Sequence, residues 1–212
     1  MLRVQTFTFN PFQENTYLII NDKNQCWIVD PGMYNAAESK HFVENIQQLQ
    51  LKPQAVINTH CHIDHIFGVK EMTEVYKIPF FIHEKELTVL NSAKSSAALF
   101  GLVFNDTPSP SGYLKASHHF MLGDDEIAIL FTPGHSPGSI CFYDIVGGWV
   151  IGGDVLFQGS IGRTDLPGGH HQTLLDSIEN ELMNLPDGVV VYPGHGTSTT
   201  IGAERKNNPF LN

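Results

Sequence analysis

Four short apolar runs in this sequence each stop at a turn that presents histidine or aspartate side chains. The runs and the turns that follow them are 56–57 with 59–65, 127–131 with 132–138, 150–151 with 152–154, and 189–192 with 193–196. Short apolar runs that stop at Gly, Pro or a polar turn are typical of buried strands. The sequence therefore favours a fold in which several strand ends meet at one sheet edge.

Strands and helices alternate through both halves of the chain. The patterning predicts strands at 4–9, 16–20, 26–29, 55–58, 79–82, 120–122, 127–131, 139–142, 149–151 and 189–192. Helical spacing of apolar residues predicts helices at 36–50, 65–76, 84–100 and 174–185. Strands grouped with interleaved helices predict two β-sheets flanked by helices, an αββα four-layer sandwich of the α+β or α/β class. A chain of 212 residues suffices for one such domain, which we expect to span 1–212.

Turn residues mark the segments between these elements. The segments 105–117 and 157–169 are predicted to be loops, and the first is expected to join the two halves of the domain. Asn35, with Glu38 three residues later, is a capping-box pattern that predicts a helix start. The charged residues Glu204, Arg205 and Lys206 are expected to lie on a solvated final helix.

The segment 59–65, Thr-His-Cys-His-Ile-Asp-His, has the highest density of metal-binding side chains. In an extended chain His60 and His62 share one face, and Cys61 points the other way as a small buried hydrophobe. Asp64 and His65 follow at the entry to the next helix, near the same edge. Histidines also occur as helix caps or as hydrogen-bonded core residues. Three histidines and an aspartate within six positions nevertheless favour a metal site.

Each of the other three turns adds one candidate ligand: His135, Asp154 and His195. A single Pro-Gly-His is more often a turn than a ligand, but the turns together with the first segment supply seven ligands. Seven ligands exceed what one tetrahedral ion takes, and they fit two divalent ions that share a bridging carboxylate. Imidazole and carboxylate accept zinc, iron or manganese, of which we expect zinc.

Other residues of metal-binding type have less specific surroundings. Asp30 ends a strand and is expected to be structural, in contact with the ligands from behind. His83 is expected in the core or at the surface. The pairs His118-His119 and His170-His171 begin a strand and a helix, where caps and solvated ends are common. His171 follows the loop 157–169 and is a candidate substrate contact.

Composition narrows the classes of partner. The net charge of −10, from 12 Lys and Arg against 22 Asp and Glu, disfavours nucleic acid. Three scattered cysteines form no disulfide framework and indicate a reducing compartment. No apolar run is long enough to cross a bilayer, and residues 1–10 have no secretory pattern. We therefore expect a cytoplasmic protein that acts on a small molecule, with its oligomeric state left open.

The ligand order His60-x-His62-x-Asp64-His65, then His135, Asp154 and His195, resembles the metallo-β-lactamase fold superfamily. Within it, the chain is similar to the glyoxalase II-like hydrolases, and more closely to their short, single-domain branch. The subfamily resemblance rests on the motifs at 153–157, 160–165 and 193–210, and the whole resemblance covers essentially the entire chain. It implies two sets of ligands with Asp154 bridging both ions: His60, His62 and His135 on the first, and Asp64, His65 and His195 on the second.

Two departures from the family pattern concern the substrate. Glyoxalase II proper has an additional C-terminal helical domain that helps to hold glutathione, and we expect none here because the chain ends at Asn212. The family's substrate-contacting Lys and the nearby Tyr correspond to Arg163 and Asp165. Arg163 can still bind a carboxylate, so it is a candidate for substrate binding. The loss of the aromatic residue argues against glutathione itself.

The function that the resemblance implies is metal-dependent hydrolysis of a small thioester such as S-lactoylglutathione, as in hydroxyacylglutathione hydrolase. Two ions about 3.5–4 Å apart can hold one water between them and lower its pKa to near 7. The resulting hydroxide would attack the carbonyl carbon, and Asp64 is expected to orient it. A thiol with a pKa of about 8.5 can leave as thiolate without a general acid.

Alternative functions remain open at this point. A persulfide dioxygenase with a single iron resembles the same subfamily and can keep most of these ligands. A β-lactamase would have to expel an amine, which is a poorer leaving group. A nuclease is disfavoured by the acidic charge and by the absence of an inserted nucleic-acid-binding domain. A non-catalytic protein would be expected to lack ligands, and none is missing.

Overall fold

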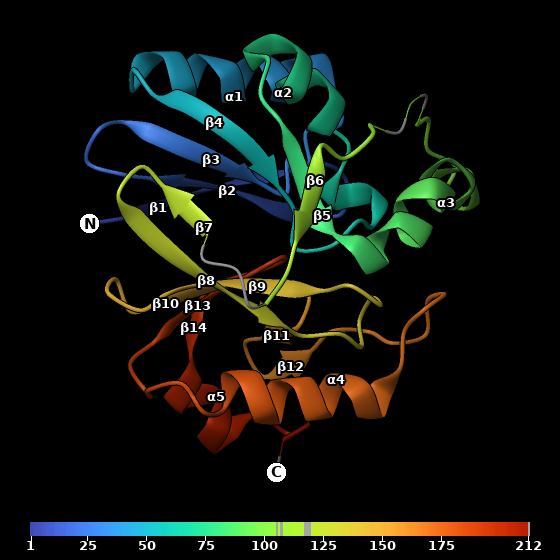
Figure 1. The fold of residues 1–212 in the computed structure, drawn as a ribbon. Coiled ribbons are helices and arrows are strands. Elements are labelled where there is room, and N and C mark those ends of the chain that lie inside the picture. Colours follow the sequence, from blue (N-terminus) through green and yellow to red (C-terminus); the bar gives the residue numbers. More distant parts are fainter. Residues whose placement is uncertain (105, 107, 117–119, 212) are drawn as a thin grey trace.

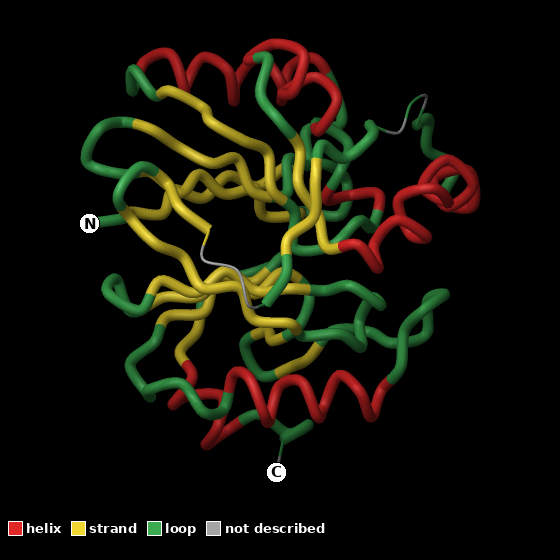
Figure 2. The backbone as a smooth tube through the Cα atoms, in the orientation of Figure 1, coloured by secondary structure: helices red, strands yellow, loops and turns green. Residues whose placement is uncertain are grey.

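Two six-stranded β-sheets lie face to face, with helices on both outer sides (Figure 1). The computed structural model describes residues 1–104, 106, 108–116 and 120–211, so the His118-His119 pair lies outside the described residues. The tube view in Figure 2 separates the four layers: helix, sheet, sheet and helix. The predicted αββα sandwich is thereby confirmed.

The first sheet has the strand order β1-β2-β3-β4-β5-β6. Its strands are β1 (Arg3–Phe9), β2 (Glu14–Ile20), β3 (Gln25–Val29), β4 (Lys52–Ile57), β5 (Phe80–His83) and β6 (Gly112–Leu114). The first three are antiparallel, and the pairs from β3 to β6 are parallel. The helices α1 (Ala36–Gln48) and α2 (Val69–Tyr76) cover its outer face, while α3 (Leu87–Leu99) stands to one side (Figure 1).

The second sheet has the strand order β14-β13-β10-β9-β8-β7. Its strands are β7 (Phe120–Leu122), β8 (Asp125–Phe131), β9 (Ile140–Asp144), β10 (Trp149–Gly153), β13 (Val190–Pro193) and β14 (Thr199–Thr200). Its outer face is covered by α4 (His171–Ser177), by the π-helical turn Ile178–Leu182 that continues α4, and by α5 (Ile201–Asn207) (Figure 1).

Strand β2 of the first sheet contributes apolar side chains to two layers of the core. Leu18 and Ile20 face the cluster beneath the helices of the first sheet, and Tyr17 and Ile19 face the cluster between the sheets. This two-residue alternation leaves every residue of β2 buried, as expected for a strand covered on both faces. A third cluster lies between the second sheet and its helices. The strand ends near the ligand turns are therefore supported from both sides.

Three sequence predictions were wrong in part. The helix predicted at 65–76 begins only at Val69, after the 3-10 turn Ile63–His65, because the carbonyl of His65 accepts a hydrogen bond from the Asn58 amide at 2.7 Å. The loop predicted at 105–117 contains β6, which pairs with β5. The loop predicted at 157–169 overlaps the hairpin of β11 (Leu156–Phe157) and β12 (Ser160–Ile161). Strands of two or three residues are too short to show a period.

The start of α1 and the charged face of α5 differ in part from the sequence predictions. Asn35 caps α1 as predicted and accepts hydrogen bonds from the amides of Ala37 and Glu38. The Glu38 carboxylate, however, accepts from Tyr34 N at 2.7 Å. On α5, the prediction of a solvated face was wrong for Glu204, which is buried and accepts a hydrogen bond from Thr199 Oγ1 at 2.6 Å. None of the helices in the described part of the chain combines the length and the hydropathy that a membrane span requires.

Candidate metal centre

The first ligand turn leaves β4 at the sheet edge and is closed by its own hydrogen bonds. The side-chain amide of Asn58 donates to the carbonyls of His60 and His65, at 3.3 and 2.7 Å. His60 and His65 are buried and His62 is partly exposed. Cys61 points into the core of the first sheet with no exposed surface, as predicted.

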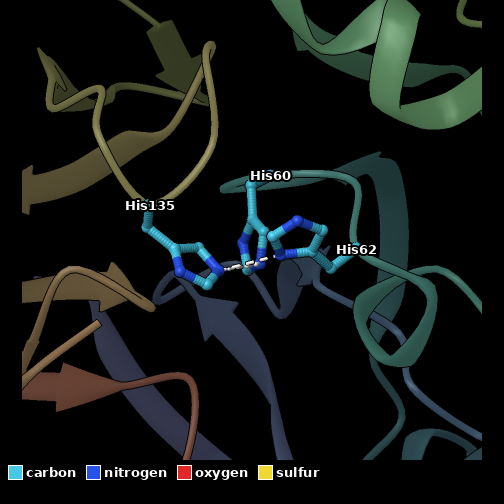
Figure 3. Close-up of side chains that lie close together, drawn as sticks. All are labelled: His60, His62 and His135. Carbon is cyan, nitrogen blue, oxygen red and sulfur yellow. Dashed lines mark hydrogen bonds between the residues drawn. The ribbon is translucent and has the colours of Figure 1, made fainter. Parts of the chain in front are cut away.

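Three histidine rings converge at one point of this edge. His135, from the loop between β8 and β9, places its Nε2 atom 2.8 Å from His62 Nδ1 and 3.3 Å from His60 Nε2 (Figure 3). The close-up shows the three rings turned toward one another, although they come from different sheets. Two loops from the two halves of the chain therefore form one three-nitrogen group.

A second group lies beside the first. His195, which follows β13, places its Nε2 atom 3.2 Å from Asp64 Oδ2. His65 Nε2 lies 3.8 Å from the same oxygen. The ligand atoms of Asp64, His65 and His195 all lie within 4.8 Å of one another, as do those of His60, His62 and His135. Each group has the size of a site for one ion.

Asp154, at the end of β10, lies between the two groups. Its Oδ1 atom is 3.5 Å from His65 Nε2. Its Oδ2 atom is 3.5 Å from His135 Nε2 and 3.5 Å from His195 Nε2. One carboxylate thus faces the second group through both oxygens and the first group through one. The structure brings together all seven side chains that the sequence singled out.

The far sides of four of these rings are held by contacts outside the two groups. His60 Nδ1 lies 3.0 Å from Thr59 Oγ1, and His65 Nδ1 lies 3.1 Å from Asp30 Oδ2. The Nδ1 atoms of His135 and His195 donate to the carbonyls of Arg163 and Phe12, at 2.8 and 3.0 Å. Such contacts fix a ring's orientation and leave Nε2 free as a ligand. The prediction that Asp30 lies behind the ligands agrees with this geometry.

The charge state of the three-histidine group suits a cation. Burial lowers the pKa of His60 well below its ordinary value, lowers that of His62 to about 3, and lowers that of His135. These rings are therefore neutral at physiological pH, which is the form that binds metal.

The second group is held together by opposite charges. Burial lowers the pKa of His65, but Asp64 and Asp154 outweigh it, so the pKa is raised well above its ordinary value. Burial raises the pKa of Asp154, but His65 outweighs it, and that pKa lies well below its usual range. A proton on His65 therefore balances carboxylates that a metal ion would otherwise neutralise.

Two buried polar atoms without hydrogen-bond partners indicate whether these residues fit metal ions. His65 Nε2 and Asp154 Oδ1 have no hydrogen-bond partner among the described residues. An orphaned buried polar atom is costly and calls for an explanation. The two atoms face each other across 3.5 Å, and a shared cation would satisfy both. The donor set therefore fits two divalent ions.

An open cavity of about 770 Å³ reaches the two groups from solvent. Its base is lined by His62, Asp64, His135, Asp154 and His195, and Arg163 belongs to its wall. The Arg163 guanidinium is paired with Asp165 through two hydrogen bonds of 2.7 Å. His171 is exposed at the start of α4 and is not among the described residues that line the cavity, so its substrate contact stays a prediction.

Sequence reasoning missed several residues around the site. Glu86 lies behind the first ligand turn, and Glu14 is buried 3.9 Å from His65 Nδ1. The cavity wall formed by α3 was also missed. The Ser and Ala residues at 92, 93, 95 and 96, within a predicted helix, were the available signal for this wall.

Comparisons with known proteins agree with this arrangement. The family model of the metallo-beta-lactamase superfamily matches residues 9–195. The probable metallo-hydrolase YqgX of Bacillus subtilis is 40% identical over 203 residues, covering 95% of this chain and 94% of the relative. The hydroxyacylglutathione hydrolase GloC of Haemophilus influenzae is 34% identical over 213 residues, covering 100% of this chain and 99% of the relative.

Solved structures of similar proteins superpose on this chain along nearly its whole length. The BLEG-1 B3 metallo-beta-lactamase superposes with a TM-score of 0.91 at 36% identity, covering 99% of both chains. TTHA1623 in a di-iron-bound form superposes with a TM-score of 0.88 at 36% identity, covering 98% of this chain and 100% of that one. With its fold, its ligand geometry and its sequence all in agreement, the chain belongs to the metallo-β-lactamase superfamily.

Proposed function

We propose that this protein is a metal-dependent thioesterase that cleaves a small thioester, with S-lactoylglutathione as the first substrate to test. The position of Asp154 carries the proposal. Its two oxygens lie 3.5 Å from ligand nitrogens of both groups, at the base of an open cavity. A carboxylate in that position suits a pair of ions on which a small molecule can react.

The seven side chains divide between the two ions in this proposal. His60, His62 and His135 would hold the first, Asp64, His65 and His195 would hold the second, and Asp154 would contact both. Two bound divalent ions supply a nucleophilic water of low pKa and a positive charge near the carbonyl oxygen.

Asp64 is the residue to which we assign the additional task of orienting the attacking water. It lines the cavity, and its pKa is lowered because the charges of His65 and His195 outweigh its burial. It is therefore ionised at neutral pH and can accept a hydrogen bond from that water. The departing sulfur can leave as thiolate, because a thiol of pKa about 8.5 needs little assistance.

The relatives support this activity without fixing the metal. One is named a hydroxyacylglutathione hydrolase and is similar along its whole length. We keep zinc as the expected metal, since histidine and carboxylate ligands suit it. Iron is the first alternative, because the similar protein TTHA1623 was solved in a di-iron-bound form. Manganese is the second.

Hydrolysis of a β-lactam is a second candidate because a B3 metallo-β-lactamase is 36% identical to this chain. It requires departure of an amine, which is harder than departure of a thiolate. A persulfide dioxygenase with one iron is a third. Because such a dioxygenase can keep most of the same ligands, the metal content and oxygen uptake of the purified protein separate it from a hydrolase.

The test compares the three activities on one preparation. The protein is purified without added metal, analysed for its metal content, and assayed with S-lactoylglutathione, with a chromogenic cephalosporin, and with glutathione persulfide while oxygen uptake is followed. We expect about two ions per chain and thioester cleavage that Asp154→Asn abolishes. One iron with oxygen uptake, or faster cleavage of the cephalosporin than of the thioester, would overturn the proposal.

A further inference from the structure

Helix α3 contributes a wall to the cavity. Its residues Leu90, Ala93 and Ala97 belong to the core cluster of the first sheet. Val89 and Ser96 line the cavity on the neighbouring surface of the helix. Because the side chains at 92, 93, 95 and 96 are only Ser or Ala, this wall leaves space where larger residues would fill it.

The rest of the wall is apolar and comes from separate segments of the chain. Phe12, Phe157 and Leu166 line it. Phe12 packs edge-on against Phe100, with ring centroids 5.5 Å apart, so the segment between β1 and β2 touches the end of α3. Leu99 is 88% exposed and also lines the cavity. An exposed apolar patch beside a cavity commonly marks a binding surface.

Positive charge is scarce in this cavity. Apart from the histidines, Arg163 is the one cationic side chain among the described residues that line it. Its guanidinium already donates to the Asp165 carboxylate from Nε and Nη2, at 2.7 Å each. The chain as a whole carries a net charge of −10. A substrate group with two carboxylates, such as glutathione, therefore finds only this one guanidinium in the wall, already paired with Asp165, and placing carboxylates against the apolar side chains is unfavourable.

We infer that the enzyme prefers thioesters that carry an uncharged apolar group, and that the α3 wall binds this group. The inference rests on the proposed thioesterase function and names its substrate class. A cavity of about 770 Å³ can hold a ligand of that size. In the reaction, water adds its oxygen to the carbonyl carbon, the C–S bond breaks with its electron pair on sulfur, and an acid and a thiol are released.

Two substrate series test the preference and locate the apolar group. The first carries acetyl, butyryl, hexanoyl and octanoyl groups on the neutral thiol N-acetylcysteamine. The second carries the lactoyl group on ethane-, butane- and hexanethiol, with S-lactoylglutathione for comparison. We expect kcat/KM to rise in at least one series by about fourfold for each buried methylene. A flat response in both series, with S-lactoylglutathione cleaved fastest, would overturn the inference.

Variants of α3 test whether this wall is responsible. In Ser96→Trp, which fills the wall, the ratio of kcat/KM between the longest and the shortest substrate of the series that responds to chain length should fall toward one. Ala98→Trp is the matched control, because Ala98 is exposed on the same helix and does not line the cavity. Its ratio should equal that of the unmodified protein. Ser92→Phe is the second variant if Ser96→Trp fails to fold by circular dichroism. A ratio unchanged in the folded lining variant would contradict the assignment.

A binding measurement separates this inference from the proposed function. Alkyl thioethers of N-acetylcysteamine cannot be hydrolysed, and their Kd can be measured by calorimetry with S-hexylglutathione for comparison. If the thioethers bind more tightly with chain length but no thioester is cleaved, the proposed function fails and the apolar binding surface stands. If thioesters are cleaved and the Kd does not depend on chain length, the function stands and this inference fails.

Discussion

The Glu86 carboxylate accepts a hydrogen bond of 2.8 Å from the backbone amide of Cys61, the residue between His60 and His62. Its other oxygen accepts bonds of 2.6 Å from Ser136 Oγ and from the Gly138 amide, in the loop that carries His135. Glu86 has no exposed surface. One buried side chain therefore ties together the two loops that form the three-histidine group.

Removal of this tie should weaken metal binding without touching a ligand. In Glu86→Ala, three buried donors lose their acceptor, at a cost of roughly 1–3 kcal/mol for each unsatisfied group. We expect the affinity for the first ion to fall by about 10- to 100-fold, as for other contacts that orient ligands. Competition with a chromogenic chelator measures it. Glu84→Ala, at an exposed position two residues earlier, is the control, and equal affinities in the two variants would contradict the role.

The sequence predicted the ligands but not Glu86, for a physical reason. Ligands are recognised because unusual residue types follow apolar runs, and that signal is local. Glu86 lies in a stretch with Glu84 and Lys85, where charged side chains are normally solvated. Its burial depends on donors 25 and 50–52 residues away in the chain, which appear only once the two sheets are packed together.

The fold was predictable where elements were long and periodic. Strand β2 and helix α1 had clear patterns, and their burial follows those patterns. The short strands β6, β11 and β12 had none, and they exist because a neighbouring backbone offers hydrogen bonds. The start of α2 was misplaced because Asn58, seven residues before His65, takes the carbonyl that would begin the helix. Tertiary hydrogen bonds of this kind leave no trace in local sequence.

The two ions should differ in the protons that they displace. The pKa of His62 is lowered to about 3 by burial, and those of His60 and His135 are also lowered, so the first ion meets no bound proton near pH 7. The pKa values of His65 and His195 are raised because their carboxylate partners outweigh burial. The second ion must therefore displace protons, and its affinity should rise as the pH increases from 6 to 8.

Calorimetry in buffers of different ionisation enthalpy measures this difference. The heat of the first binding step should be nearly independent of the buffer, and that of the second should change with it. The Asp64→Asn variant should keep the first step and lose most of the second. Equal proton release in the two steps would contradict the assignment of charge to the two groups.

Asp154→Asn should affect both ions at once. The amide has no negative charge, yet it occupies the position that faces His65, His135 and His195. Loss of a residue that only hydrogen-bonds to a ligand typically lowers metal affinity by roughly 10- to 100-fold. We expect a larger loss of affinity in Asp154→Asn, and we expect thioester cleavage to fall with it. His62→Ala should lose metal and activity together in the same way. Elemental analysis and a thioester assay on the same samples check this, and full turnover by a metal-free variant would rule the mechanism out.

The three thiols should be unreactive in the folded protein. Cys26, Cys61 and Cys141 have no exposed surface. Burial raises the pKa of Cys26 and of Cys141 to about 12, and raises that of Cys61 well above its ordinary value. Since the thiolate is the reactive form, iodoacetamide at pH 8 should label none of them before urea is added, and all three afterwards. Mass spectrometry counts the labels. Rapid native labelling of Cys61 would show that the first ligand turn opens.

Gly194 offers the sharpest test of how closely the backbone approaches the ligands. A Cβ atom at this position would lie 2.0 Å from Asp154 Oδ1 and 2.8 Å from His65 Cε1. The backbone cannot move away easily, because the Gly194 amide donates to Gly153 at 2.8 Å and its carbonyl accepts from Asn15 at 2.7 Å. In Gly194→Ala the Asp154 carboxylate must therefore be displaced.

We expect Gly194→Ala to lower stability by about 1–3 kcal/mol through overpacking and to weaken binding of the second ion more than that of the first. Gly188→Ala is the matched control, because a Cβ atom there meets nothing within 4 Å at an exposed turn before the same strand, β13. That variant should bind both ions normally, and its stability should be unchanged or slightly higher, since alanine reduces the entropy of the unfolded chain. Denaturant unfolding and metal titration of the two variants decide the matter. If Gly194→Ala binds both ions as tightly as Gly188→Ala, then Asp154 does not need its observed position to hold them.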